Sequence, residues 1–114
     1  MIKEVLLLQR FGQIIKIKPE MKNRYLELHR NAWPEVLSKI SKCNIRNYSI
    51  FSYDEYLFAY YEYVGNDYET DMKKMADDPS TQKWWDECMP CQESLSADST
   101  REWWLNMECV FFTP

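Results

Sequence analysis

Apolar and polar positions along the first third of the chain predict one strand followed by two helices. Residues 11–18 hold β-branched apolar side chains and lead into Pro19, whose fixed φ suits the first turn of a helix. Pro34 cannot continue that first helix, predicted over residues 20–31, so a second helix is predicted from Pro34 to about Lys42. The apolar positions of the first helix follow helical spacing: Met21, Tyr25, Leu28 and Ala32.

Two aromatic-rich strands are predicted next, over residues 44–53 and 56–64. The two-residue gap Asp54-Glu55 between them predicts a hairpin, although it lacks the Asn-Gly or Asp-Gly pair typical of the tightest turns. Large apolar side chains occur at both parities of the strands, as in the adjacent pair Ile50 and Phe51. A sheet of this kind has to be covered on both faces.

The next part of the chain predicts two further helices. Asp67 is a suitable N-cap for a helix that runs through Ala76. Asp78, followed by a proline, begins another helix that ends near Cys88.

The order of the predicted elements is β-α-β-β-α-β, because residues 89–101 are polar and irregular and residues 102–112 predict a last aromatic strand. This α+β order is that of the ferredoxin-like fold, an antiparallel four-stranded sheet with its helices on one face. The helix-free face needs a second cover, and another copy of the same sheet is the simplest one. The sequence therefore predicts a homodimer, a dimeric α/β barrel.

Length and composition narrow the possible functions. The 114 residues fit one soluble domain, and two glycines are too few for a glycine-rich phosphate-binding loop. A net charge of −4 and the lack of a basic block disfavour nucleic acid and membrane partners. The N-terminal apolar run is too short for a signal peptide, so a cytoplasmic location is predicted. The aromatic content of 16% indicates that some rings line a pocket or an interface.

Four cysteines raise the question of metal or redox chemistry. Cys88 and Cys91 form a C-x-x-C, but the pair ends a helical pattern instead of following a strand. Cys43 and Cys109 are too scattered to supply the second pair of a zinc site. The sequence therefore predicts reduced thiols and no metal site.

His29 is the only histidine and the natural acid–base group, because imidazole titrates near neutral pH. Tyr25 and Trp33 lie four residues before and after it on the predicted helix, so the three side chains project toward a common side. The same pattern is typical of a structural histidine, and the spacing of Tyr25 is equally typical of a core aromatic.

Two pairs of adjacent tryptophans are further candidates. On a helix, Trp84 and Trp85 diverge by about 100°, so one can anchor the core while the other faces elsewhere. In the predicted last strand, Trp103 and Trp104 point to opposite faces. Exposed indoles suit sugar C–H edges, stacked bases or partner proteins, whereas core or dimer-interface packing is the plainer interpretation for at least two of the four.

A set of short strings occurs in one colinear order over residues 11–114, and together they resemble the L-rhamnose mutarotase family. The strings are Tyr25-x-x-x-His29, Trp33-Pro34-Glu35, Asn47-Tyr48-Ser49-Ile50-Phe51, Leu57-Phe58-Ala59, Gln82-Lys83-Trp84-Trp85 and Val110-Phe111-Phe112-Thr113-Pro114. The resemblance implies the ferredoxin-like dimeric α/β-barrel fold and an isomerase that interconverts the α and β anomers of L-rhamnose without a metal or organic cofactor.

The resemblance also implies roles for individual residues. It places the proton donor at His29. It implies an N-terminal extension at residues 1–10 and a mutarotase-like domain over residues 11–114. The sugar-binding positions that it implies are Tyr25, Tyr48, Trp84 and Trp85.

Alternatives remain open beside this interpretation. The polar segment 93–100 is an insertion near the tryptophan pair, where substrate preference can change, so another 6-deoxy-L-hexose such as L-fucose is an alternative substrate. The same fold hosts haem-binding oxygenases in which a helix histidine ligates iron, and His29 could play that part; a Soret band would reveal it. The fold also serves non-catalytic dimers that bind small ligands.

Overall fold

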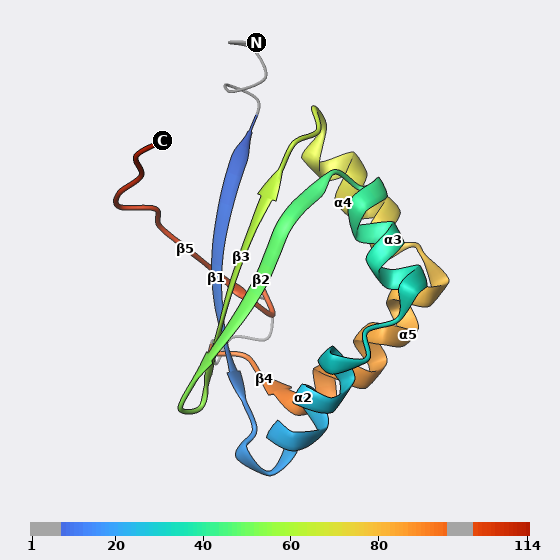
Figure 1. Ribbon diagram of the computed structural model, residues 1–114, viewed down its shortest axis with the longest axis vertical. Coiled ribbons are helices and arrows are strands. Elements are labelled where there is room, and N and C mark those ends of the chain that lie inside the picture. Colours follow the sequence, from blue (N-terminus) through green and yellow to red (C-terminus); the bar gives the residue numbers. More distant parts are fainter. Residues whose placement is uncertain (1–7, 96–101) are drawn as a thin grey trace.

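The computed structural model describes residues 8–95 and 102–114 as an antiparallel sheet with helices packed on one face (Figure 1). No helix in these ranges is long and apolar enough to cross a membrane. The elements, in chain order, are β1 (Gln9–Ile17), η1 (Pro19–Met21), α2 (Lys22–Arg30), α3 (Pro34–Lys42), β2 (Ile45–Tyr53), β3 (Tyr56–Tyr63), α4 (Tyr68–Ala76), α5 (Pro79–Cys88), η2 (Met89–Cys91), β4 (Gln92–Glu93) and β5 (Leu105–Met107).

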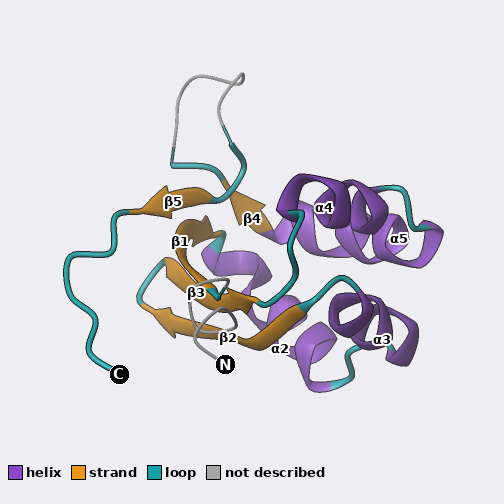
Figure 2. Ribbon diagram, turned by 90° about the horizontal axis from the view of Figure 1, so that it is seen from above, coloured by secondary structure: helices purple, strands orange, loops and turns teal. Residues whose placement is uncertain are grey.

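The strand order is β2-β3-β1, and both β4 and β5 pair with the remaining edge of β1. In the central β1–β3 pair, Gln9 lies opposite Tyr63 and Lys16 lies opposite Tyr56. Figure 2 shows the helices gathered on one side of the sheet. Helices α2 and α3 connect β1 to β2, and α4 and α5 follow β3. The predicted βαββαβ order and ferredoxin-like fold are therefore confirmed.

Aspartates fix where the later helices begin, as the sequence predicts. Asp67 accepts a hydrogen bond from the backbone N–H of Thr70 at 3.2 Å, and Asp78 accepts one from the N–H of Thr81 at 3.0 Å. Such N-caps satisfy donors that lack an intrahelical partner and stabilise a helix by about 1 kcal/mol. In the predicted β2–β3 hairpin, Asp54 takes a φ of 56°, a left-handed conformation that aspartate tolerates.

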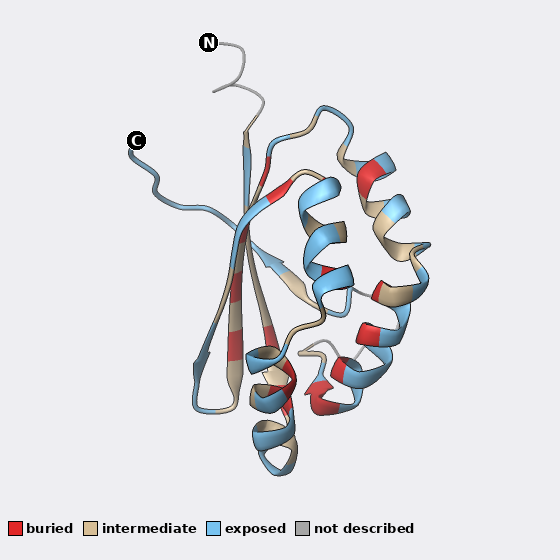
Figure 3. Cartoon of the chain, turned by 45° about the vertical axis from the view of Figure 1, so that its right-hand side comes forward, coloured by how far each residue is buried: buried red, intermediate tan, exposed pale blue. Residues whose placement is uncertain are grey.

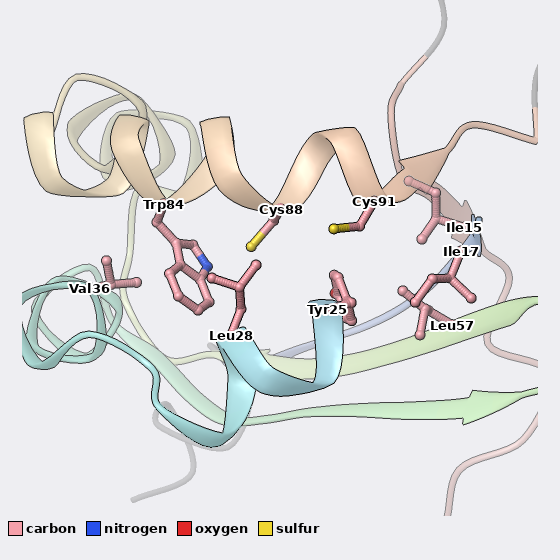
Figure 4. Close-up of a cluster of buried hydrophobic side chains, with 9 residues drawn as sticks. All are labelled: Ile15, Ile17, Tyr25, Leu28, Val36, Leu57, Trp84, Cys88 and Cys91. Carbon is pink, nitrogen blue, oxygen red and sulfur yellow. The ribbon is translucent and has the colours of Figure 1, made fainter. Parts of the chain in front are cut away.

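The core lies between the sheet and the helices. Every second residue of β3 is buried, from Leu57 to Tyr63, because strand side chains alternate between the two faces. A second group of buried residues packs against Met72 and Met75 of α4 and contains Ile45, Tyr61 and Tyr63. The main cluster joins β1 and β3 to α2, α3 and α5 (Figure 4), and its buried members are Ile15, Ile17, Tyr25, Leu28, Val36, Leu57, Trp84, Cys88 and Cys91.

The opposite face of the sheet has no helix over it and is rich in apolar side chains. Phe51 on this face is 65% exposed, and Val110 and Phe111, in the C-terminal segment that follows the last strand, are 86% and 79% exposed. Figure 3 shows the exposed β2 strand and C-terminal segment in pale blue. The strand registers place one apolar row across this face, made of Leu105, Ile14, Phe58 and Phe51. Apolar residues therefore do occupy both faces of the sheet.

Two predictions for the C-terminal part of the chain are wrong. The last strand does not extend over residues 102–112, because only Leu105–Met107 pair with β1. Beyond Met107 the chain leaves the sheet (Figure 1), and strand-forming side chains without a neighbouring strand make no ladder. Residues 89–95 are not irregular, because they contain η2 and then β4 on the edge of β1. Residues 96–101 lie outside the described residues.

Candidate active site

A cavity of about 440 Å³ lies between the helix-facing side of the sheet and helices α2, α3, α4 and α5. This volume falls within the range of about 300–1,000 Å³ that small-molecule sites occupy. Its surface is mostly apolar and aromatic, with few polar groups. The structure brings all the predicted site residues to this one cavity, which is lined by Tyr25, His29, Tyr48, Trp84 and Trp85.

One nitrogen of His29 is held by the backbone of its own helix. Nδ1 lies 2.8 Å from the carbonyl oxygen of Tyr25, which can only accept, so Nδ1 carries the proton in the neutral ring. Nε2 is then the nitrogen with the free lone pair. Burial lowers the pKa of His29 below its ordinary value, with the Tyr25 carbonyl opposing the effect. The imidazole is therefore neutral near pH 7 and able to accept a proton at Nε2.

Tyr25 supplies a hydroxyl beside this imidazole. The two rings lie 4.1 Å apart between centroids, and Tyr25 is only 3% exposed. Its hydroxyl oxygen accepts a hydrogen bond from Nε2 of Gln92 at 3.2 Å. Burial raises the pKa of Tyr25 far above its ordinary value, so the phenol keeps its proton at any physiological pH. Tyr25 can therefore donate a hydrogen bond but does not act as a base.

The two helix tryptophans have different environments, as their spacing predicts. Trp84 is 8% exposed and lies edge-on to His29, with ring centroids 5.1 Å apart. Trp33 packs against it from α3's N-cap position at 5.2 Å. Trp85 is 38% exposed and also lines the cavity. Trp84 thus joins the core to the cavity wall, whereas Trp85 presents an accessible indole.

Tyr48 lies on the sheet side of the cavity. It follows Asn47, a residue with a φ of 53°, in the stretch where the β2–β3 register shifts. Its ring packs against Tyr61 at 5.4 Å between centroids. Although 43% of the residue is exposed, burial of its hydroxyl end raises the pKa of Tyr48 to about 12. A second protonated phenol therefore faces the cavity from the strand opposite α2.

The C-x-x-C cysteines belong to the core. Cys88 and Cys91 are buried free thiols on α5 and η2, and Figure 4 shows both side chains directed into the cluster that contains Tyr25. Burial raises the pKa of Cys88 to about 12, and the Cys91 thiol lies 3.7 Å from the carbonyl oxygen of Glu87. Such thiols stay protonated and unreactive. Within residues 8–95 and 102–114, no three histidine, cysteine or acidic side chains gather as a metal site.

Several residues of the cavity wall lie outside the predicted site, Gln92 among them, and the sequence singled out Trp103 and Trp104 as an adjacent pair without placing them in it. The prediction that Trp103 and Trp104 point to opposite faces of a strand is wrong, because both precede β5 in a bend and both line the cavity. Gln92 is 4% exposed on a two-residue strand, which gives no periodic signal. The sequence signal for this part of the cavity wall is the adjacent pair Trp103 and Trp104.

Residues 10–113 match the model of the L-rhamnose mutarotase family. The chain belongs to this family. It is 30% identical over 87 residues to an L-rhamnose mutarotase of Listeria monocytogenes, covering 76% of this chain and 83% of the relative. The Bacillus subtilis L-rhamnose mutarotase is 30% identical over 91 residues, covering 78% and 85%.

Solved structures show the same fold. A crystal structure of the L-rhamnose mutarotase FA22100 from Formosa agariphila aligns with a TM-score of 0.71 and 24% identity, covering 93% of this chain and 99% of that one. Tetracenomycin F2 cyclase from Streptomyces glaucescens aligns with a TM-score of 0.68 at 8% identity and the same coverage. Family membership confirms the resemblance seen in the sequence and assigns the chain to the isomerases.

Proposed function

We propose that this chain interconverts the α and β anomers of L-rhamnose, with His29 as the group that carries the proton. The observation that carries the proposal is the hydrogen bond between Nδ1 of His29 and the carbonyl of Tyr25 beside the cavity. It leaves Nε2 as a proton acceptor next to a phenol that keeps its proton. One acceptor and one donor are what anomer exchange requires, and family membership supports the same activity.

Anomer exchange opens the sugar ring and closes it on the other face of the aldehyde. In the opening step, Nε2 of His29 removes the anomeric hydroxyl proton, the C1–O5 bond breaks, and the imidazolium returns that proton to O5. Such positioned acid–base catalysis contributes about 10²–10⁴-fold. The Tyr25 hydroxyl donates a hydrogen bond to O5 and stabilises its developing negative charge. Rotation about C1–C2 and reversal of both transfers give the other anomer.

The remaining predicted residues bind the sugar in this proposal. The accessible indole of Trp85 packs against the C6 methyl group and C–H edges of a 6-deoxy sugar, together with the edge of Trp84. A hydroxyl group at C6 would be desolvated there without a hydrogen-bond partner, which is unfavourable. Tyr48 donates a hydrogen bond to a sugar hydroxyl from the sheet side. These contacts act on the ground state and transition state alike, and therefore set affinity more than rate.

We propose in addition that the active form is a homodimer joined through the outer sheet faces. The supporting observation is the row of Leu105, Ile14, Phe58 and Phe51 together with the exposed C-terminal Val110 and Phe111. An apolar surface of this kind is rare on soluble monomers. A second copy with the same face covers it by two-fold symmetry.

Three further predictions belong to the same proposal. The protein works in the cytoplasm, and its activity needs no added metal or organic cofactor, because side chains supply every proton. Residues 1–10 are an extension of the domain formed by residues 11–114. The family match begins at residue 10, close to this boundary, whereas β1 already begins at Gln9, so the last two residues of the proposed extension belong to the sheet. Residues 1–7 lie outside the described residues.

The experiment is NMR saturation transfer between the α and β anomeric protons of several sugars, after dialysis of the protein against a chelator. The proposal predicts faster exchange for L-rhamnose than for L-fucose or D-glucose. Preference for L-fucose would change the assigned substrate but not the chemistry. Spontaneous rates for every sugar would contradict the proposed function, and activity restored only by a metal would contradict the mechanism.

A further inference from the structure

A chain of two hydrogen bonds ends at the Tyr25 hydroxyl. The indole Nε1 of Trp103 donates to Oε1 of Gln92 at 2.8 Å, and Nε2 of Gln92 donates to the Tyr25 hydroxyl oxygen at 3.2 Å. Gln92 and Tyr25 are 4% and 3% exposed, whereas Trp103 is 37% exposed. The three residues come from the bend before β5, from β4 and from α2. A partly exposed residue thus connects to the buried phenol beside His29.

The chemistry of indole sets the direction of both bonds. An indole N–H can only donate, so Gln92 must turn its carbonyl oxygen toward Trp103. The amide nitrogen of Gln92 then faces Tyr25, where it can only donate. Tyr25 therefore receives a hydrogen bond on its oxygen and directs its own proton elsewhere. Among the described residues no acceptor takes that proton, and the tyrosine lines the cavity.

We propose that Trp103 and Gln92 are positioning residues that fix Tyr25 as a hydrogen-bond donor to an oxygen atom of the ligand. The inference rests on the proposed function, in which that atom is the ring oxygen of a pyranose. Without the indole N–H, the buried amide can turn over and present its carbonyl to Tyr25. The phenol then donates to Gln92, and the ligand loses its donor.

The sharpest test replaces the amide of Gln92 with a group of the same shape that accepts a hydrogen bond from Tyr25 instead of donating one. In Q92E the ionised carboxylate accepts from both Trp103 and Tyr25, so it takes the proton that Tyr25 otherwise offers. We expect the maximal exchange rate to fall about tenfold or more, with a smaller change in sugar affinity. Q82E is the matched control, because Gln82 is exposed on α5 and bonds the carbonyl of Ala76, outside the cavity.

The pH dependence of the Q92E exchange rate distinguishes a positioning role of Gln92 from a purely structural role in packing. A protonated carboxylic acid can accept at one oxygen and donate from the other, as the amide accepts at its oxygen and donates from its nitrogen. The rate of Q92E relative to the wild-type rate at the same pH should therefore recover as the pH falls through the carboxyl pKa. A purely structural role gives a ratio that does not rise at low pH, and this result would overturn the proposal.

A second variant covers the case in which Q92E does not fold. W103F keeps a ring in place and removes only the indole donor, and its rate should fall about three- to tenfold. In the Tyr25→Phe background, W103F should cause no further loss of rate, because the relay, the hydrogen-bond chain from Trp103 through Gln92 to Tyr25, then has no hydroxyl to orient. An equal loss from W103F in both backgrounds would show that Trp103 acts independently of Tyr25.

A measurement without sugar distinguishes failure of the relay from failure of the proposed function. The Tyr25 ring carbon bonded to oxygen can be followed by ¹³C NMR in protein with labelled tyrosine and assigned by its loss in Tyr25→Phe. Its resonance should shift in W103F and stay in place in Q82E. An unshifted resonance in W103F overturns the relay whether or not any sugar reacts. A shifted resonance in a protein inactive on every sugar supports the relay and contradicts the mutarotase proposal.

Discussion

The backbone carbonyl oxygen of Tyr25 lies 2.8 Å from Nδ1 of His29, one helical turn further along α2. The side chain of the same tyrosine lies against the imidazole, with 4.1 Å between ring centroids. Tyr25 therefore acts on His29 through its backbone and on the cavity through its hydroxyl. Side-chain substitution can remove the second role and leave the first in place.

The first prediction uses this separation. Tyr25→Phe deletes one hydroxyl and keeps the ring and the carbonyl that holds Nδ1 of His29. The maximal exchange rate should fall about tenfold, with little change in sugar affinity, because the lost bond forms to charge that develops in the transition state. Tyr60→Phe is the control, since the Tyr60 hydroxyl bonds to Glu62. An unchanged rate in Tyr25→Phe would remove the donor from the mechanism.

The second prediction concerns pH. His29 must be neutral to accept a proton, so activity should fall as the pH drops through its folded pKa. Burial places that pKa below the ordinary 6.5, and the activity plateau should therefore extend below pH 6.5. In that window the unfolded chain binds a proton that the folded chain does not, so stability should also decrease toward low pH. A midpoint above 6.5 in the rate profile would contradict the neutral, desolvated imidazole.

The third prediction separates the adjacent tryptophans. Trp84→Ala removes a buried core ring, and denaturant titration should show a loss of about 3–5 kcal/mol in the free energy of unfolding. Trp85→Ala should cost about 1 kcal/mol or less because Trp85 is 38% exposed, yet it should weaken sugar binding. Calorimetric titration with L-rhamnose measures that affinity. Unchanged affinity in Trp85→Ala would exclude its indole from the sugar site.

The fold could be predicted from sequence because its main signals are local. Period-two burial on β3, the proline at the start of α3 and the aspartate caps each mark an element within a few residues. The prediction of a strand over residues 102–112 is wrong because aromatic composition is a local signal, whereas a strand also needs a partner, and the chain leaves the sheet after Met107. The edge of β1 pairs with β4 at Lys16 and Ile17 and with β5 at Gly12 to Ile14.

The fourth prediction tests the dimer. Light scattering at micromolar concentration should give about twice 13.9 kDa. Phe51→Glu places a charge on the outer sheet face and should shift the protein toward monomer, because a buried unpaired carboxylate is costly. Leu37→Glu is the control, since Leu37 is 53% exposed on α3, on the helix side. A monomeric wild-type protein, or equal dimer loss in both variants, would contradict the sheet-to-sheet interface.

From spacing alone, the candidate site could be predicted only where its residues share an element, and Tyr48 on β2 was predicted from the family resemblance. His29 and Tyr25 are one turn apart on α2, and Trp84 and Trp85 are adjacent on α5. The bonds from Trp103 to Gln92 and from Gln92 to Tyr25 span 11 and 67 residues, and no sequence spacing reports them. The direction of these hydrogen bonds follows from the donor chemistry of indole, but only the three-dimensional structure reveals that they form.

The most direct test of the account is the α/β exchange rate of L-rhamnose measured by saturation transfer in the wild-type protein and in His29→Ala. The wild type should exchange the anomers far above the spontaneous rate. His29→Ala should lose most of this acceleration, about 10²-fold or more, while circular dichroism shows an intact fold. Full acceleration in a folded His29→Ala protein would contradict the assignment of the proton carrier to His29.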